Sequence, residues 1–259
     1  MHSSSSRDRI ESTEHSGMSK MSNSDRCAPT STTGEGTSTS ASAHVLSLPP
    51  PGFHLQHNAL SEDAWEEIRE WLGLNLDDDN LGIAYNPSKI KRDDGCVINW
   101  EASPGDQCRP VAQFGIAKYD YIADVVVSCN QKNADIPPIL KRLLLTNRNG
   151  NDGTHAAALA SQEWSQCIIN AYGANSSSHI PWHVDDPKFG PVILVYTFGE
   201  ARPLRMRKDD GDNQEFYSAQ PKHLSRYILS GESREDWQHS VPAGESWRVS
   251  ITFRTLRDE

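Results

Sequence analysis

The chain has 259 residues, a formal net charge of −10 at pH 7 and 36% hydrophobic residues, enough for one sizeable domain or two small ones. The negative balance is not that of a protein that binds nucleic acid non-specifically over its whole surface. No apolar run approaches the roughly 18 residues of a membrane-spanning helix, so we expect no membrane partner.

Residues 1–46 are rich in Ser, Thr and Gly and contain no aromatic residue. Such a segment buries too little apolar surface to offset the entropy lost on ordering, so we predict a disordered tail. It lacks the apolar stretch of a secretory signal, and its acidic residues are unlike a mitochondrial presequence. We therefore expect an intracellular protein, in the nucleus or the cytoplasm, with one folded domain over residues 47–259.

Two helices are predicted in the first part of this domain. Ser61 is suited to the N-cap position, and apolar residues follow it at helical spacing, which predicts an amphipathic helix over residues 61–73. A second helix is expected to begin near Pro138, because proline is favoured in the first turn. Residues 147–162, rich in Asn, Gly and Ala, are interpreted as a mobile insertion.

Beyond Trp164, short extended runs alternate with turn signals up to the C-terminus. We predict strands over residues 166–172, 192–198, 204–207, 226–229, 237–241 and 247–253. Many short strands at close spacing favour a sandwich or a barrel over a parallel α/β sheet. The predicted fold class is therefore mainly β with flanking helices.

The motif His183-Val184-Asp185 places an imidazole and a carboxylate two residues apart. On a strand, both side chains point to the same face and can reach one ion. His239, near the end of another predicted strand, can supply a second imidazole. Two histidines and one carboxylate form a facial triad that leaves coordination positions open for a co-substrate and O2. We predict that His183, Asp185 and His239 are the metal ligands and form the catalytic centre.

Arg248 and Arg254 flank the last predicted strand. Their spacing of six residues is even, so both guanidinium groups should lie on one face of that strand. Each guanidinium can offer two parallel hydrogen bonds to a carboxylate. The pair therefore predicts a binding site for a dicarboxylate.

Taken singly, each of these patterns has a purely structural explanation. An HxD pair is commonly part of a surface turn, a lone histidine is commonly half-buried, and two strand arginines commonly form a solvated face. The order HxD, then His, then two arginines on the last strand is much harder to obtain by chance, so we interpret the three patterns together.

Further motifs stand in the same part of the chain. In chain order the motifs are Asn170-Ala-Tyr172, His183-Val-Asp185, a strand from Pro191 to Gly199, Gly231-Glu-Ser-Arg234, Trp237-Gln-His239 and Arg248-Val-Ser-Ile-Thr-Phe-Arg254. In this order they resemble the AlkB-like iron(II)- and 2-oxoglutarate-dependent dioxygenases, from about residue 166 to residue 254.

The resemblance implies a double-stranded β-helix, a jelly-roll-like pair of sheets, with helices packed outside. It implies Fe(II) as the cofactor, held by the predicted triad, and 2-oxoglutarate and O2 as co-substrates. By the same resemblance, Arg248 and Tyr172 should face the distal carboxylate of 2-oxoglutarate, and Arg254 and Asn170 its keto-acid end. The implied products are succinate, CO2 and a hydroxylated substrate, which releases formaldehyde where the carbon is an N-methyl group.

Substrate class stays open between DNA, RNA and protein, on all of which AlkB-like enzymes act. We expect oxidative demethylation of N-alkylated bases, in nucleic-acid repair or regulation. Tyr119 and Tyr121 could stack on a flipped base or simply be two half-buried strand tyrosines. Trp182 is expected to pack away from the metal.

The acidic balance favours the alternative of a protein-directed hydroxylase or demethylase, because a nucleic-acid channel should be basic. A basic strip formed by Arg205 and Arg207 beside the metal would argue against that alternative. A catalytically inactive β-helix that serves as a binding module is the remaining alternative, which the intact triad disfavours.

Overall fold

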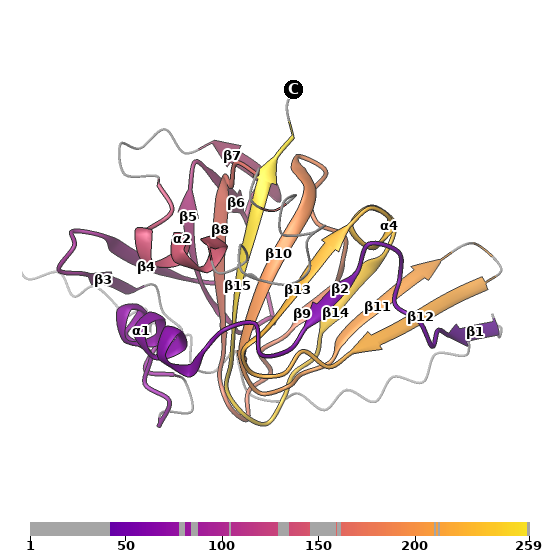
Figure 1. The fold of residues 1–259 in the computed structure, drawn as a ribbon, viewed down its shortest axis with the longest axis horizontal. Coiled ribbons are helices and arrows are strands. Elements are labelled where there is room, and N and C mark those ends of the chain that lie inside the picture. Colours follow the sequence, from indigo (N-terminus) through magenta and orange to yellow (C-terminus); the bar gives the residue numbers. More distant parts are fainter. Residues whose placement is uncertain are drawn as a thin grey trace, which may run out of the picture.

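Two β-sheets dominate the chain (Figure 1). The computed structural model describes residues 42–77, 81–83, 88–103, 105–128, 135–145, 159, 162–209, 211 and 213–257. Residues 1–41 of the predicted tail, and all but 159 and 162 of the predicted insertion at 147–162, lie outside this described part.

The larger sheet contains eight strands in the order β2-β13-β10-β15-β8-β5-β4-β3. Its pairings are all antiparallel, and its centre is formed by β10, β15 and β8. The strands are β2 (His54–Gln56), β3 (Ser88–Lys91), β4 (Val97–Ala102), β5 (Pro110–Gly115), β8 (Gln166–Tyr172), β10 (Phe189–Gly199), β13 (Ser225–Ser230) and β15 (Arg248–Leu256).

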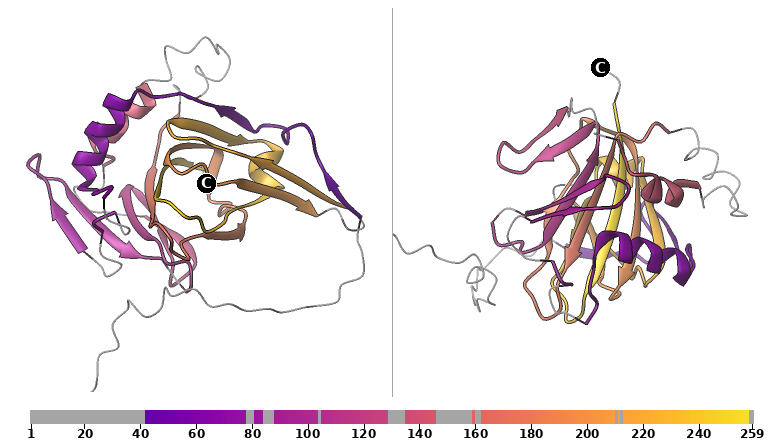
Figure 2. Two further views of the ribbon diagram at one scale, coloured as in Figure 1. Left: turned by 90° about the horizontal axis from the view of Figure 1, so that it is seen from below. Right: turned by 90° about the vertical axis from the view of Figure 1, so that its left-hand side faces the viewer.

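The smaller sheet contains five strands in the order β1-β12-β11-β14-β9, and two strands form a separate hairpin, β6-β7. These strands are β1 (Ser42–Val45), β6 (Ala117–Asp120), β7 (Val125–Ser128), β9 (Ile180–His183), β11 (Leu204–Asp209), β12 (Asn213–Ala219) and β14 (Gln238–Val241). The two sheets curve around a common interior, as the view along the barrel shows (Figure 2).

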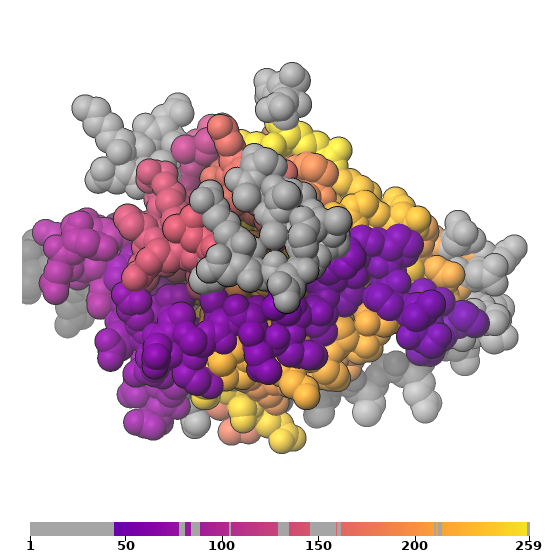
Figure 3. Space-filling model, viewed as in Figure 1, coloured from indigo at the N-terminus to yellow at the C-terminus, as the bar shows by residue number. Residues whose placement is uncertain are grey.

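Helix α1 (Glu62–Leu72) lies within the predicted range of 61–73, whose two end residues are its caps. The Ser61 side chain accepts a hydrogen bond from the Ala64 backbone N–H, which caps the N-terminus. Gly73 ends the helix in the left-handed conformation at φ 71°, where glycine has no steric penalty. In the space-filling view, the N-terminal segment from β1 through β2 to α1 runs across one face of the molecule (Figure 3).

Helix α2 (Pro138–Leu145) begins at the predicted proline, and the short helix α4 (Glu232–Glu235) precedes β14. Both α1 and α2 lie outside the larger sheet (Figure 2). None of the described helices is long and apolar enough to cross a membrane.

The larger sheet separates two apolar clusters. On its outer face, Trp65, Ile68 and Leu72 of α1 pack in one cluster with strand residues such as Ile169 and Phe253. On its inner face, residues of the larger sheet pack against Leu204, Met206 and other residues of the smaller sheet. Period-two alternation along β8 and β15 therefore assigns one set of side chains to the helices and the other to the interior between the sheets.

The predicted fold class is confirmed: the protein is mainly β, with helices outside two facing sheets in the jelly-roll-like arrangement of a double-stranded β-helix. All six predicted C-terminal strands are present, and several are longer than predicted. The sequence did not reveal β12, because its polar residues lack clear alternation. The disordered tail was also predicted to extend to residue 46. In the structure, residues 42–45 of that segment form β1, which pairs in parallel with β12.

Trp65 fixes α1 to the larger sheet and provides a stability prediction. Its ring is 1% exposed and stacks on Phe198 at a centroid distance of 4.2 Å. Replacing a buried Trp by Ala removes this packing and leaves a cavity, so Trp65→Ala should lower the free energy of unfolding by about 3–5 kcal/mol. Chemical denaturation measures this loss. The exposed Glu70→Ala change on the same helix should stay within about 0.5 kcal/mol, and equal losses for both variants would contradict the assigned packing.

Candidate functional site

The three residues of the predicted triad meet at one end of the interior. His183 is the last residue of β9, Asp185 lies two residues beyond it, and His239 is on the neighbouring strand β14, directly opposite His183 in the ladder. The two imidazole rings are 4.2 Å apart between centroids. One ligand atom from each of the three side chains lies within 4.8 Å of the others. This donor set, two nitrogens and one carboxylate oxygen on one side, is that of a facial triad.

The surroundings keep these side chains in the protonation states that a metal requires. Burial lowers the pKa of His183, and it lowers the pKa of His239 to about 3 with a further contribution from the neighbouring imidazole. Burial raises the pKa of Asp185, but Arg254 and the two histidines outweigh it, so that this pKa ends well below its usual value. Two neutral imidazoles and one carboxylate are the forms that coordinate a cation.

Hydrogen bonding also selects the ring nitrogen of His183. Its Nδ1 lies 2.9 Å from the Pro181 carbonyl oxygen, which can only accept a hydrogen bond. The proton of the neutral ring therefore resides on Nδ1, and Nε2 keeps its lone pair. A backbone carbonyl partner of this kind is the usual means by which a protein orients a metal-binding histidine.

Arg254 joins the triad to the larger sheet. Its Nη2 lies 2.5 Å from Asp185 Oδ1, and its Nη1 donates to Gln166 Oε1 at 2.9 Å. The guanidinium also lies over the Phe189 ring, with Cζ 4.9 Å from the centroid. Its Nε is buried without a hydrogen-bond partner among the described residues. Arg254 therefore orients the carboxylate and retains one buried donor for a further acceptor.

The other residues predicted to bind the co-substrate lie on the same inner face of β8 and β15. In the register of these strands, Arg248 is opposite Tyr172, Ser250 is opposite Asn170 and Arg254 is opposite Gln166. The prediction that Arg248 and Arg254 share one strand face is confirmed. Six residues of strand separate their backbones by about 20 Å, and the two side chains extend from the ends of that stretch.

Several polar atoms of this face are buried without partners among the described residues. They are Tyr172 Oη, Arg248 Nε, Arg248 Nη1 and Arg254 Nε. Leaving buried donors unpaired costs about 1–3 kcal/mol each, and more where the group is charged. An anion with a carboxylate at each end would satisfy both arginines, so the donor set fits a dicarboxylate.

Arg109 is a residue of the site that the sequence did not single out. It is 5% exposed, its Nε donates to Asn170 Oδ1 at 3.0 Å, and its Nη1 donates to the His179 carbonyl at 2.9 Å. Because Asn170 Oδ1 is used by Arg109, the amide nitrogen of Asn170 remains for a ligand. An arginine directly before the largely apolar strand β5 was the only local signal of this role.

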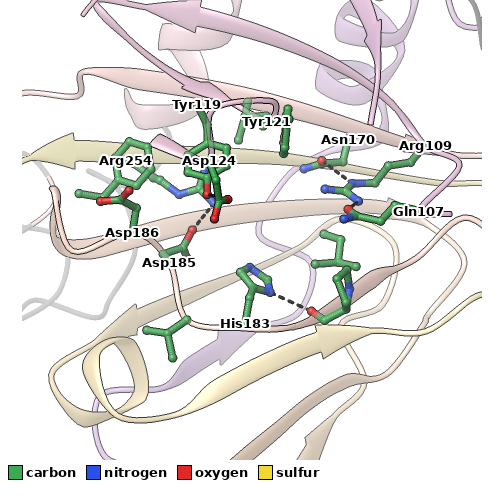
Figure 4. Close-up of a pocket in the computed structure, with 15 residues that line it drawn as sticks. Gln107, Arg109, Tyr119, Tyr121, Asp124, Asn170, His183, Asp185, Asp186 and Arg254 are labelled. Atoms are coloured by element: carbon green, nitrogen blue, oxygen red, sulfur yellow. Dashed lines mark hydrogen bonds and ion pairs between the residues drawn. The ribbon is translucent and has the colours of Figure 1, made fainter. Parts of the chain in front are cut away.

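A cavity of about 260 Å³ opens beside the triad (Figure 4). Its wall opposite His183 includes Tyr119, Tyr121 and Asp124 of the hairpin β6-β7 and its turn, which we call the 117–128 hairpin. The two tyrosine rings meet edge to face, 5.2 Å apart, and the Tyr119 hydroxyl donates to Asp124. Burial, with Asp124 nearby, raises the pKa of Tyr119, so its hydroxyl stays protonated.

Trp182 lies outside this cavity, as its position in the strand predicts. Its ring is covered by Arg207, with Cζ 4.6 Å from the centroid. Arg205 and Arg207 project from the outward face of β11, whereas Leu204 and Met206 are fully buried. Arg205 and Arg207 thus share one face of β11, as alternation predicts, but that face is turned away from the triad, and Arg207 contacts Trp182, the residue next to His183.

Comparison with known proteins agrees with this geometry. Residues 107–254, more than half of the chain, match the family model described as the 2OG-Fe(II) oxygenase superfamily. Alpha-ketoglutarate-dependent dioxygenase alkB homolog 3 from Bos taurus and that from Homo sapiens are each 29% identical over 163 residues, 58% of this chain and 52% of the relative. DNA oxidative demethylase ALKBH2 from Arabidopsis thaliana is 28% identical over 125 residues, 38% of this chain and 40% of the relative.

The chain thus spans about half the length of the curated relatives it matches. The matched region contains both histidines, the carboxylate and both arginines of the site. The AlkB-like resemblance of the sequence is confirmed, and the chain belongs to the 2OG-Fe(II) oxygenase superfamily.

Proposed function

We propose that this protein is an Fe(II)- and 2-oxoglutarate-dependent dioxygenase that removes N-alkyl groups from bases of DNA or RNA. The observation that carries the proposal is the placement of a His-His-Asp triad at a cavity whose opposite wall holds two tyrosines. Membership of the superfamily supports the co-substrate, and the residues around the cavity support a flat, nitrogen-containing substrate.

In this proposal His183, Asp185 and His239 hold Fe(II). Both imidazoles are neutral and the carboxylate is ionised, so none of the three has to lose a proton when the metal binds. The Pro181 carbonyl orients one histidine, and Arg254 orients the carboxylate. Fe(II) with 2-oxoglutarate and O2 supplies the oxidising power for C–H hydroxylation, while the protein supplies position and a shielded pocket.

Arg248 and Tyr172 are proposed to bind the distal carboxylate of 2-oxoglutarate, and Arg254 and Asn170 its keto-acid end. The unpaired buried donors of Arg248, Tyr172 and Arg254 support these roles, because a dicarboxylate would complete their hydrogen bonds. Arg109 fixes the Asn170 amide with its nitrogen free for the ligand.

The substrate side of the proposal rests on the 117–128 hairpin. Tyr119 and Tyr121 present aromatic surface to the cavity, on which an extruded base can stack. Asp124 and Asp186 also line the cavity and favour a base that carries positive charge or amino donors. Hydroxylation of an N-methyl carbon gives a hemiaminal, whose C–N bond breaks to release formaldehyde and return the N–H base.

A protein-directed hydroxylase with the same site is the second candidate, and the net charge of −10 favours it. The strip of Arg205 and Arg207 on the outward face of β11 favours a polyanion instead. Of the three relatives named above, one carries the name DNA oxidative demethylase, which supports a nucleic-acid substrate for this chain.

Methyl loss from defined substrates tests the proposed reaction. The protein with Fe(II), ascorbate and 2-oxoglutarate should demethylate at least one N-methylated DNA or RNA oligonucleotide, with one succinate formed per formaldehyde. Mass spectrometry and product analysis measure both. Methylated peptides are the matched comparison, and peptide demethylation with every nucleic acid untouched would replace the proposed substrate by protein.

The metal assignment is tested with Asp185→Asn, which keeps the shape of the side chain but removes its charge. Mutation of groups that only orient the metal ligands lowers metal affinity about 10- to 100-fold. Loss of the charge of a ligand itself should therefore weaken Mn(II) binding more than about 100-fold. Electron paramagnetic resonance of free Mn(II) measures the affinity. The nearby Asp186→Asn variant is the control, and equal affinities for Asp185→Asn and the unaltered protein would refute the triad.

The co-substrate assignment is tested with Arg248→Met, which keeps the aliphatic stem and removes the donors. Loss of a charged hydrogen bond is worth about 1.5–3 kcal/mol, which corresponds to an increase of about 10- to 100-fold in the Kd for 2-oxoglutarate. Calorimetry in the presence of Mn(II) gives this Kd. Arg205→Met, on the outward face of β11, should leave the Kd unchanged, and an unchanged Kd for Arg248→Met would remove Arg248 from the site.

A further inference from the structure

The 117–128 hairpin has few contacts that hold it in place. Within the part of the chain that the structure describes, its two strands pair only with each other and form a sheet separate from the two large ones. At the start of the hairpin, the Ala117 N–H donates to the Ser165 carbonyl oxygen at 3.1 Å. An isolated two-stranded hairpin is at best marginally stable in water. Ala117 and Val126 pack against Phe189, which anchors one end. The position of Tyr119 over the cavity therefore depends on additional contacts with the larger sheet.

The side chain of Gln113 provides such a contact. Gln113 lies on β5, and its Oε1 accepts a hydrogen bond from the Tyr119 backbone N–H at 2.8 Å. Its Nε2 donates to the Tyr119 carbonyl oxygen at 2.9 Å. One amide side chain thus satisfies both backbone groups of a single residue, as an adjacent strand does in a sheet ladder.

Gln166 extends this contact toward the metal site. It lies on β8, is completely buried, and its Nε2 donates to Gln113 Oε1 at 2.9 Å. Its Oε1 accepts the hydrogen bond from Arg254 Nη1, and Arg254 in turn holds Asp185. A continuous chain of hydrogen bonds therefore runs from the hairpin to the carboxylate of the triad.

Donor and acceptor chemistry allows this chain only one direction. Arginine has no acceptor, so Gln166 must turn its oxygen to Arg254 and its amide nitrogen to Gln113. Gln113 must then offer its oxygen to Gln166, which leaves its nitrogen for the Tyr119 carbonyl. Turning either amide by 180° would set donor against donor or acceptor against acceptor in a buried site.

We propose that Gln113 and Gln166 are positioning residues that couple the placement of Tyr119 to the orientation of Arg254. We call the pair the glutamine relay. Neither side chain is proposed to touch the reacting atoms. The relay holds the substrate-facing hairpin and the co-substrate-facing arginine in one arrangement. A change in the position of Tyr119 should therefore alter the orientation of Arg254, and the reverse. The role toward 2-oxoglutarate rests on the proposed function, whereas the placement of the hairpin does not.

Amide exchange of Tyr119 in the ligand-free protein is the primary test. Gln113→Leu removes the acceptor of the Tyr119 N–H, and loss of one such hydrogen bond corresponds to about a tenfold faster exchange. Gln166→Leu should raise the same rate, because the Gln113 amide then loses the donor that orients it. Hydrogen exchange followed by NMR measures the rate, and amides of β8 report global opening. Unchanged Tyr119 exchange in both variants would overturn the relay.

Gln166→Glu separates the two ends of the relay. Its carboxylate still accepts from Arg254 but cannot donate to Gln113. Calorimetry with Mn(II) should give a Kd for 2-oxoglutarate within about threefold of the original, whereas Gln166→Leu should raise it about tenfold. Tyr119 exchange should rise in both variants. Slow Tyr119 exchange in Gln166→Glu would show that the hairpin does not depend on Gln166 and would overturn the coupling.

Tyr196→Phe is the matched control, because it also removes a buried side-chain hydrogen bond, from Tyr196 Oη to the Leu143 carbonyl, on the outer face of the larger sheet. It should lower thermal stability without changing Tyr119 exchange or the Kd, and equal effects in Tyr196→Phe would reduce the relay to general stability. If the unaltered protein fails to bind 2-oxoglutarate with Mn(II), the proposed function is wrong, and the exchange of Tyr119 in the ligand-free variants still decides the relay.

Discussion

The ion pair between Asp185 and Arg254 is the contact on which the arrangement of the site depends. Asp185 follows the last residue of β9 in the smaller sheet, and Arg254 lies on β15 in the larger one. Their side chains are 5% and 12% exposed. Burial of either charge alone would cost several kcal/mol, so the two sheets can approach at this end only when both are present. The same pair keeps the carboxylate ionised beside two neutral imidazoles, which prepares the triad for a cation.

The strands that hold the residues of the site also form the centre of the apolar core. In β8 and β15, residues such as Ile169 and Phe253 face the helices, while Asn170 and Arg254 face the interior. A shift of one residue in their register would bring the apolar set inward and the polar set under the helices. Burial on the outer face therefore fixes the register that aligns the polar residues on the inner face. The chemistry of the site is positioned by packing on the opposite side of the same sheet.

The parts of the site that sequence predicts are those set by local geometry. The two-residue spacing of His183 and Asp185, and the even spacing of the two arginines, need only strand periodicity. Arg109 and the glutamine relay depend on partners far away in the chain: Arg109 bonds to a residue 61 positions away, and Gln113 and Gln166 are 53 positions apart. A polar residue within an apolar strand shows that a partner exists but not which residue it is. Strand β12 was missed for a related reason, because its place is defined by pairing with β11 and β1 rather than by its own composition.

The acidity of the chain and a polyanionic substrate are physically compatible. At physiological ionic strength, exposed charges more than about 8 Å apart are largely screened from each other, so a net charge of −10 spread over the protein has little effect at one surface. What a substrate meets is the local set of groups. Arg207 covers Trp182 on the outward face of the smaller sheet, whereas Asp124 and Asp186 line the cavity beside the triad. The cations of the strip and the carboxylates of the cavity therefore lie on different surfaces, so the net charge of the chain predicts the local potential at neither of them.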